Sequence, residues 1–249
     1  MLLHIFGTCS GTEPYPGRHH TAFAFEHNER LYWFDAGEGC AYTAHMMGVD
    51  LLRLRKIVIS HPHIDHVGGL ANLAWTVGKL ARVQKRPPEH EIELLLPDLR
   101  VWEGAAAMSG MGEGIGAREY ADGLLFADEG FRVTALHNRH LSHEDGAPWR
   151  SFGFLIECEG KRVVYSGDTK GVEDYAALLP CDLLLMETGH HHPPEVAREL
   201  LARGMFPGRL AFLHHGRDIL DRYDVQVEAL DEIVPGRYRI LDDATTMEV

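Results

Sequence analysis

Three histidines and an aspartate lie within six residues, in the run Ser60-His61-Pro62-His63-Ile64-Asp65-His66-Val67-Gly68-Gly69-Leu70. The run lies between an apolar segment at 56–60 and a helical pattern that begins at Gly69. Because side chains alternate in an extended chain, we expect His61, His63 and Asp65 to converge on one side. His66, placed where the chain turns into the helix, then faces a second centre. Nitrogen and oxygen donors gathered in this way predict a site for two divalent cations.

The composition of the chain favours the same chemistry. Histidine, the commonest metal ligand and the side chain that titrates near neutral pH, accounts for 17 of 249 residues. The four cysteines form no Cys-x-x-Cys pair, which excludes a zinc ribbon and a redox dithiol of that type. Apolar residues make up 45% and charged residues 24%, as in ordinary globular proteins.

The net charge limits the choice of partner. With 24 Lys and Arg against 37 Asp and Glu, the formal charge is −13, and such a field disfavours nucleic acid as a partner. A modest basic cluster, formed by Lys79, Arg82, Lys85 and Arg86, is the exception. The sequence has no apolar run of about 20 residues and its start has no basic stretch of the signal-peptide type. We therefore expect a cytoplasmic protein that makes no membrane contact; a homodimer is compatible with the sequence.

Local patterns predict a mixed α/β protein. Short apolar runs predict strands at 2–6, 21–26, 30–35, 56–60, 91–96, 131–136, 152–157, 161–166, 182–187 and 209–213. Helical patterns lie at 38–47, 68–84, 98–107, 172–178, 194–203 and 224–233. Early strands follow one another as hairpins and later ones alternate with helices, which indicates layers of sheet covered by helices.

Three further expectations concern the organisation of the chain. No repeat and no interdomain linker is visible, so a single domain over 1–249 is expected. The segment 103–130, rich in glycine and methionine, predicts a mobile loop or lid, with an ordinary surface loop as the equal alternative. A short strand pair near 237–248 is expected to close the chain.

The His-x-His-x-Asp-His run, followed by a Gly-Gly-Leu helix start, resembles the signature of the metallo-β-lactamase fold superfamily. Other segments resemble further family elements in order: the first strand and Gly-Thr loop at 3–12, the Asp-x-Gly-Glu-Gly element at 35–39 and the Ser-Gly-Asp-Thr element at 166–169. The resemblance runs from end to end and favours the ribonuclease Z and phosphodiesterase branch. It implies a four-layer αββα sandwich of two mixed sheets flanked by helices, with the site at one edge of the two sheets.

The resemblance also implies a set of ligands for two divalent ions, with zinc favoured and manganese or iron accepted. One ion would bind His61, His63 and His140, the other Asp65, His66 and His215, and Asp168 would bridge them. His140 fits the position after strand 131–136 best, with His137 and His143 as alternatives. His215 fits the pattern of an apolar strand, one spacer and a histidine, with His214 as the alternative.

Several polar groups are candidates for acid and base roles. Asp65 is placed to orient or deprotonate the attacking water. Asp35 or Glu38 is a candidate acceptor for the second ring N–H of a histidine ligand. The resemblance further implies that Glu187, with His192 or His191, donates a proton to a leaving alkoxide; the alternative is a helix start whose histidines are merely exposed.

The predicted activity is hydrolysis of a small phosphodiester by a water activated between two metal ions. The alternatives are a tRNA 3′-processing endonuclease similar to ribonuclease Z, a lactone or thioester hydrolase, and a di-iron redox or binding protein. Ribonuclease Z-like enzymes carry an inserted basic arm that grips tRNA, and between Gly69 and Phe131 this chain offers only the basic cluster. The small phosphodiester is therefore favoured.

Overall fold

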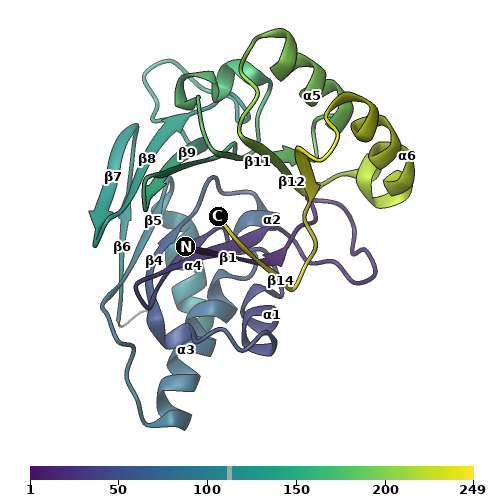
Figure 1. The fold of residues 1–249 in the computed structure, drawn as a ribbon. Helices are drawn as coiled ribbons and strands as arrows, with labels where there is room; N and C mark the ends of the chain where they lie inside the picture. Colours follow the sequence, from purple (N-terminus) through teal and green to yellow (C-terminus); the bar gives the residue numbers. More distant parts are fainter. Residues whose placement is uncertain (111–113) are drawn as a thin grey trace. The chain divides into compact units, whose positions relative to one another are not determined.

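The computed structural model describes residues 1–110 and 114–249, and the chain divides into two compact units. Unit 1 comprises residues 1–120 and 242–249, and unit 2 comprises residues 121–241. Each unit is built on one mixed seven-stranded sheet with its own helices (Figure 1). Two mixed sheets flanked by helices are the fold class expected from the sequence. The single domain over 1–249 stays a prediction.

The sheet of unit 1 has the strand order β14-β1-β2-β3-β4-β5-β6. Its strands are β1 (Leu2–Gly7), β2 (Ala22–His27), β3 (Arg30–Phe34), β4 (Leu54–Val58), β5 (Ile92–Leu96), β6 (Ile115–Glu119) and β14 (Thr245–Glu248). The strands from β14 to β3 are antiparallel, and those from β3 to β6 are parallel. Because β1 pairs with β14, the two ends of the chain lie side by side (Figure 1).

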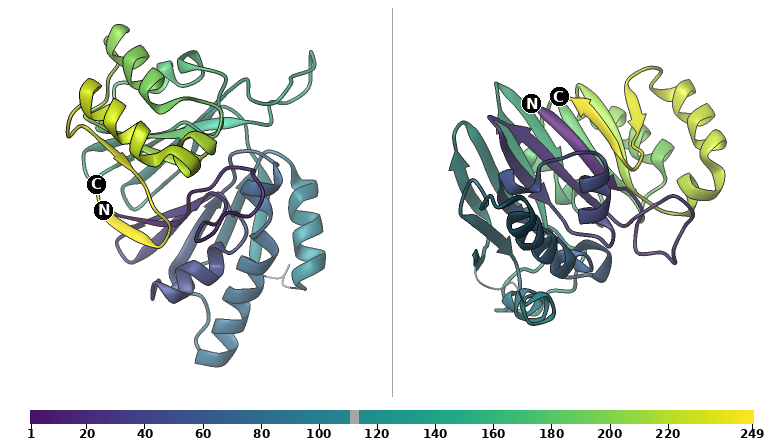
Figure 2. Two further views of the ribbon diagram at one scale, coloured as in Figure 1. Left: turned by 90° about the vertical axis from the view of Figure 1, so that its right-hand side faces the viewer. Right: turned by 90° about the horizontal axis from the view of Figure 1, so that it is seen from below.

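Helices of unit 1 lie on one face of this sheet (Figure 2). They are α1 (Cys40–Met46), the short η1 (Leu51–Arg53), α2 (Ile64–Val67), α3 (Leu70–Gln84) and α4 (Leu99–Ser109). Several of them connect parallel strands, because a parallel pair needs a crossover. Their apolar sides bury a core with Trp33, Ile57, Leu73 and Leu94. This core fixes the ends of β3 and β4, where the polar residues of the site begin.

Unit 2 has the strand order β13-β12-β11-β10-β9-β8-β7. Its strands are β7 (Gly123–Asp128), β8 (Phe131–His137), β9 (Phe152–Cys158), β10 (Lys161–Tyr165), β11 (Leu183–Thr188), β12 (Arg209–His215) and β13 (Tyr238–Ile240). The helical elements are η2 (Val172–Asp174), η3 (Ala176–Leu178), α5 (Pro193–Ala202) and α6 (Arg217–Ile233). The pairs from β10 to β13 are parallel, so β10, β11 and β12 end at the same edge of the sheet.

The expectation of a loop over 103–130 was wrong. The alanines of this segment are good helix formers and continue α4 to Ser109, after which Gly110 ends the helix with a φ of +62°. Farther along, β6 pairs with β5 and β7 pairs with β8. The middle of the segment, 111–113, lies outside the described residues.

Two smaller expectations were also wrong. The helix expected at 172–178 is two short 3₁₀ turns, η2 and η3. The C-terminal pair near 237–248 is not a pair, because β13 joins β12 in unit 2 and β14 joins β1 in unit 1. Among the described residues, no helix has the length and apolar character that crossing a bilayer requires.

Candidate metal centre

The His-x-His-x-Asp-His run follows β4 at the end of a parallel strand in unit 1. Backbone pairing ends at Val58, and α2 begins at Ile64 with His63 as its N-cap. The alternation of side chains predicted for 61–65 requires an extended chain up to Asp65. The chain instead turns into α2 at Ile64. Asp65 and His66 instead project from the first turn of α2, where a carboxylate also interacts favourably with the helix N-terminus.

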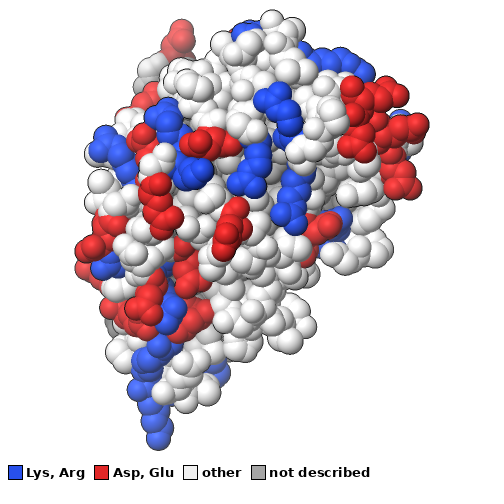
Figure 3. Space-filling view, in the orientation of Figure 1, with Lys and Arg blue, Asp and Glu red and all other residues white. Residues whose placement is uncertain are grey.

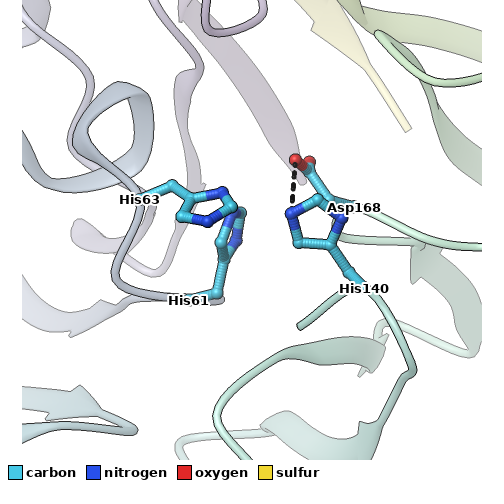
Figure 4. Close-up of side chains that lie close together, drawn as sticks. All are labelled: His61, His63, His140 and Asp168. Carbon is cyan, nitrogen blue, oxygen red and sulfur yellow. Dashed lines mark ion pairs between the residues drawn. The ribbon is translucent and has the colours of Figure 1, made fainter. Parts of the chain in front are cut away.

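In unit 1 the rings of the three histidines lie against one another. The ring centroid of His61 is 4.7 Å from that of His63 and 4.1 Å from that of His66; Figure 4 shows the contact of His61 with His63. His66 Nε2 lies 3.4 Å from Asp65 Oδ2. A Cβ atom at Gly11 would lie 3.0 Å from Asp65 Oδ2, so the glycine leaves room for this carboxylate.

Asp35, directly after β3, orients His66 and Ser60 through hydrogen bonds. Its buried carboxylate accepts hydrogen bonds from the backbone N–H of Ser60 at 2.7 Å and the hydroxyl of Ser60 at 2.9 Å. His66 Nδ1 lies 2.8 Å from Asp35 Oδ2. Because an ionised carboxylate can only accept, Nδ1 carries the proton and Nε2 is the nitrogen suited to bind a metal.

In unit 2 a second cluster surrounds Asp168, which is 2% exposed and follows β10. His214 Nε2 lies 3.4 Å from Asp168 Oδ1, and His140 Nε2 lies 3.6 Å from Asp168 Oδ2, the pair dashed in Figure 4. His190 Nδ1 lies 3.9 Å from the same Oδ2 atom. Asp168, His190 and His214 each offer a ligand atom within 4.8 Å of the others. Of the three candidates after β8, the structure thus brings His140 to this carboxylate.

The histidine that β12 brings to Asp168 is His214, the alternative, and not His215. Leu213 pairs with Glu187 and His215 with Thr188, so His214 is an extra residue in a β-bulge, with a φ of +53°. The choice of His215 rested on the family pattern of an apolar strand, one spacer and a histidine, and the bulge puts His214 beside Asp168 instead. His215 Nδ1 lies 3.1 Å from the Thr188 hydroxyl, and its Nε2–H donates to the Leu241 carbonyl at 2.8 Å.

Glu187, at the end of β11, pairs with His190. The side chain of His190 donates to Glu187 Oε1 at 3.0 Å, and its backbone N–H donates to Oε2 at 2.9 Å. Burial by itself raises the pKa of Glu187, but the hydrogen bonds from His190 and His214 outweigh it and lower that pKa to about 2. The hydrogen bond to Glu187 raises the pKa of His190. The dyad therefore places an imidazole that is 44% exposed beside Asp168.

The sequence prediction paired Glu187 with His192 or His191, and the structure also places His190 beside this carboxylate. His191 Nε2 lies 2.9 Å from the Thr169 hydroxyl and 3.4 Å from Glu187 Oε1. His192, more exposed, pairs with Asp218 of α6. The sequence signal for His190 is its position three residues after Glu187, the buried carboxylate at the end of β11. At this spacing both the ring and the backbone N–H of His190 reach the Glu187 carboxylate.

The remaining candidates have other partners. His137 pairs with Asp122, and His143 stacks on Trp149. Glu38, the other carboxylate considered for orienting a ligand, instead pairs with His19 and His20.

Both clusters have the donor chemistry that divalent transition metals select. Each combines imidazoles, at least one of them buried, with a buried carboxylate, and that set suits zinc, manganese and iron. The Asp35–His66 pair matches the carboxylate–histidine arrangement that fixes metal ligands. The residues present therefore fit metal binding.

Comparison with known proteins identifies relatives along most of the chain. The family model of the beta-lactamase superfamily domain matches residues 32–216. Ribonuclease Z of Treponema pallidum is 35% identical over 74 residues, which is 30% of this chain and only 24% of that relative. Ribonuclease Z of Methanothermobacter thermautotrophicus is 23% identical over an alignment that covers 100% of this chain and 97% of the relative.

Solved structures share the fold. YhfI, a metallo-β-lactamase fold protein of Bacillus subtilis, superposes with a TM-score of 0.74 over 99% of both chains, at 18% identity. The short form of human tRNase Z has a TM-score of 0.71 over 100% of this chain and 99% of its own, at 22% identity. A diphosphatase of the PhnP family has a TM-score of 0.69 over 100% of this chain and 97% of its own, at 14% identity.

Proposed function

The chain belongs to the beta-lactamase superfamily, and from that premise we propose that it is a metal-dependent phosphodiesterase acting on a small phosphodiester. The observation that carries the choice of a phosphodiester is the Glu187–His190 dyad beside Asp168. An alkoxide leaving group has a high pKa and gains more from a general acid than do the leaving groups of thioesters. The name ribonuclease Z among the relatives supports the same class of bond.

In this proposal each of the two clusters binds divalent metal, with zinc favoured. The proposed ligands are His61, His63, Asp65, His66, His140, Asp168 and His214, the last replacing His215. When bound, such metal lowers the pKa of a water molecule and neutralises charge on the transferring phosphoryl group. Asp168 would offer its carboxylate to bound metal, and Asp35 keeps His66 in the tautomer that binds through Nε2.

The protein side chains supply the proton transfers. Asp65 accepts the proton of the attacking water. His190 donates a proton to the leaving oxygen as the P–O bond breaks. Glu187 keeps the ring of His190 in place through its hydrogen bonds. His191 contacts both Glu187 and Thr169, and His192 pairs with Asp218.

The experiment is hydrolysis of bis(p-nitrophenyl) phosphate by protein loaded with zinc or manganese. We expect release of p-nitrophenol that is lost in Asp168→Ala and in the presence of a chelator. His27→Ala, at a histidine outside the proposed site, serves as the matched control. Inactivity of the wild type with both metals would reject the proposal.

The role of His190 has its own test, because general acid catalysis matters most for poor leaving groups. His190→Ala should lower kcat/KM for a diester with an alkyl leaving group by about 10²–10⁴-fold, the usual range for a general acid. For a p-nitrophenyl diester, whose leaving group needs no proton, the loss should be much smaller. Equal losses on both substrates would refute the assignment.

A ribonuclease Z-like activity on tRNA precursors is the second candidate, and the names of the relatives favour it. The basic cluster at the end of α3 gives RNA a contact surface, seen as the blue group at the lower end of Figure 3. Arg86 of that cluster, however, pairs with Asp50 and Glu89, and α6 carries a patch of acidic side chains (Figure 3). An RNA endonuclease should bind tRNA precursor with a salt slope of several ions; absence of binding at low salt removes this candidate.

A further inference from the structure

Three aromatic rings form a continuous stack in unit 2, on the loop that carries His140. The ring of His137, the last residue of β8, lies 4.1 Å from that of Trp149, with 14° between their planes. On the other side of Trp149, the ring of His143 lies 3.8 Å away with a plane angle of 11°. The distances and the small angles are those of parallel stacked rings.

One end of the stack is fixed and the other end is open. Asp122 accepts a hydrogen bond from the backbone N–H of His137 at 2.6 Å, and its second oxygen lies 2.5 Å from His137 Nδ1. The backbone N–H of Asn138 donates to the Ser151 carbonyl at 2.9 Å, which closes the base of the loop. Trp149 is half-buried between the two imidazoles, and His143 is exposed. The stack is therefore a rigid support whose last ring faces solvent.

The charges of the loop 138–150 differ between its base and its tip. Arg139 is held by Asp174, with 2.5 Å between Nε and Oδ1, and it directly precedes His140. Glu144 and Asp145 follow His143 at the exposed tip. Arg139 is thus neutralised by its carboxylate partners, whereas His140 at the base of the loop lies beside Asp168. A metal-binding base and a flat ring farther out match the two ends of a nucleotide, since proteins bind bases on aromatic planes.

We propose that the outer face of His143, backed by Trp149 and His137, is a stacking plate for the nucleobase of the substrate. This inference rests on the proposed phosphodiesterase activity and narrows its substrates to nucleotide phosphodiesters. The phosphate lies toward His140, and the base lies on His143. Glu144 and Asp145 repel a further phosphate beyond the base, so a single nucleotide or the end of a strand fits this plate.

The kinetic test compares two substrates that release p-nitrophenol, one with a base and one without. These are thymidine 5′-(p-nitrophenyl phosphate) and methyl p-nitrophenyl phosphate. In His143→Ala, the ratio of their kcat/KM values should fall about 5- to 150-fold, the range that stacking of one base gives. His143→Phe, which keeps a flat ring, should retain the ratio, and His45→Ala, at an exposed histidine of α1, should leave it unchanged. An unchanged ratio in His143→Ala overturns the proposal.

A binding test does not depend on turnover. By calorimetry on metal-free protein, adenosine 5′-monophosphate should bind more tightly than ribose 5-phosphate, and His143→Ala should abolish the difference. Equal affinities in the wild type overturn the plate even if the protein hydrolyses phosphodiesters. A preference for the base in a protein that hydrolyses no phosphodiester supports the plate and rejects the proposed function instead.

A third arm identifies the source of the base. If the plate binds the base of a single nucleotide, an eight-residue adenosine oligonucleotide should bind no more tightly than adenosine 5′-monophosphate. Tighter binding of the oligonucleotide, with a salt slope of several ions, assigns the plate to the end of an RNA strand.

Discussion

Two buried residues with left-handed backbones aim the polar groups of the site. Asp35 has a φ of +54° and His214 a φ of +53°, although neither is glycine. Such conformations cost on the order of 1–3 kcal/mol each and persist only where the surroundings fix them. Each occurs at the end of a strand, and each turns a side chain toward one of the two clusters. The strain therefore serves the placement of Asp35 beside His66 and of His214 beside Asp168.

Replacement of Asp35 by asparagine should weaken metal binding. The amide keeps the shape of the side chain, but it no longer selects the tautomer of His66 that leaves Nε2 available. Loss of such a partner typically lowers metal affinity about 10- to 100-fold. The measurement is the dissociation constant for zinc by competition with a chromophoric chelator. Asp98→Asn, at a buried carboxylate that caps α4 outside the site, should leave the constant unchanged; an unchanged constant in Asp35→Asn contradicts the role of Asp35.

His214 and His215 form a matched pair of neighbouring buried imidazoles. His214→Ala should reduce the number of ions bound per chain and lower activity at least about 100-fold. His215→Ala should keep the metal content but lower the free energy of unfolding by about 1–3 kcal/mol, because the Leu241 carbonyl loses its donor. Metal analysis and urea unfolding of both variants test this. Loss of metal in His215→Ala alone would show that the choice from the sequence was the better one.

At the scale of elements, the sequence predicts what depends on local pattern. Apolar periodicity predicts the strands and most of the helices. The run at 61–66 is recognised because three histidines and an aspartate at this spacing are typical of metal binding. Prediction fails where geometry departs from the regular repeat. The bulge at His214 brings the neighbour of the expected histidine to Asp168. The short α2 begins at Ile64, one residue before Asp65, so the alternation of an extended chain has ended before that residue. The hydrogen bond that selects His190 depends on how the chain turns after β11, which no periodicity encodes.

In unit 1, ion pairs between neighbouring strands should make the stability of the fold depend on pH. Glu93 of β5 pairs with Lys56 of β4 at 2.5 Å and with Arg118 of β6 at 2.6 Å. Partial burial alone raises the pKa of Glu93, but these hydrogen bonds outweigh it and hold the pKa below its usual value. A carboxyl whose folded pKa is lowered stabilises the fold above its unfolded pKa, about 4.3, and loses this contribution as the pH falls through the folded pKa.

Glu93→Gln should therefore destabilise the protein most at neutral pH. We expect a loss of about 1–2 kcal/mol at pH 7, since Lys56 is left nearly buried without its charged partner. Urea unfolding at a series of pH values should show the gap between variant and wild type closing below pH 4. The exposed Glu91 provides the control Glu91→Gln; a gap that does not depend on pH contradicts the assignment.

At the scale of the whole molecule, bound metal should stabilise the folded chain. Ions that bind only the folded chain stabilise it by mass action. Free zinc at about 100 times its dissociation constant adds about 2.7 kcal/mol. Calorimetry should show a higher unfolding temperature with zinc than with a chelator, and no such shift in Asp168→Ala.

The number of divalent ions bound per chain tests the central claim most directly. It is measured by elemental analysis of the purified protein after loading with zinc or manganese and dialysis. We predict two ions per chain in the wild type and fewer than two in Asp168→Ala, whose metal-binding carboxylate is gone. A wild-type protein that retains no divalent ion, or the same content in both proteins, would contradict the account.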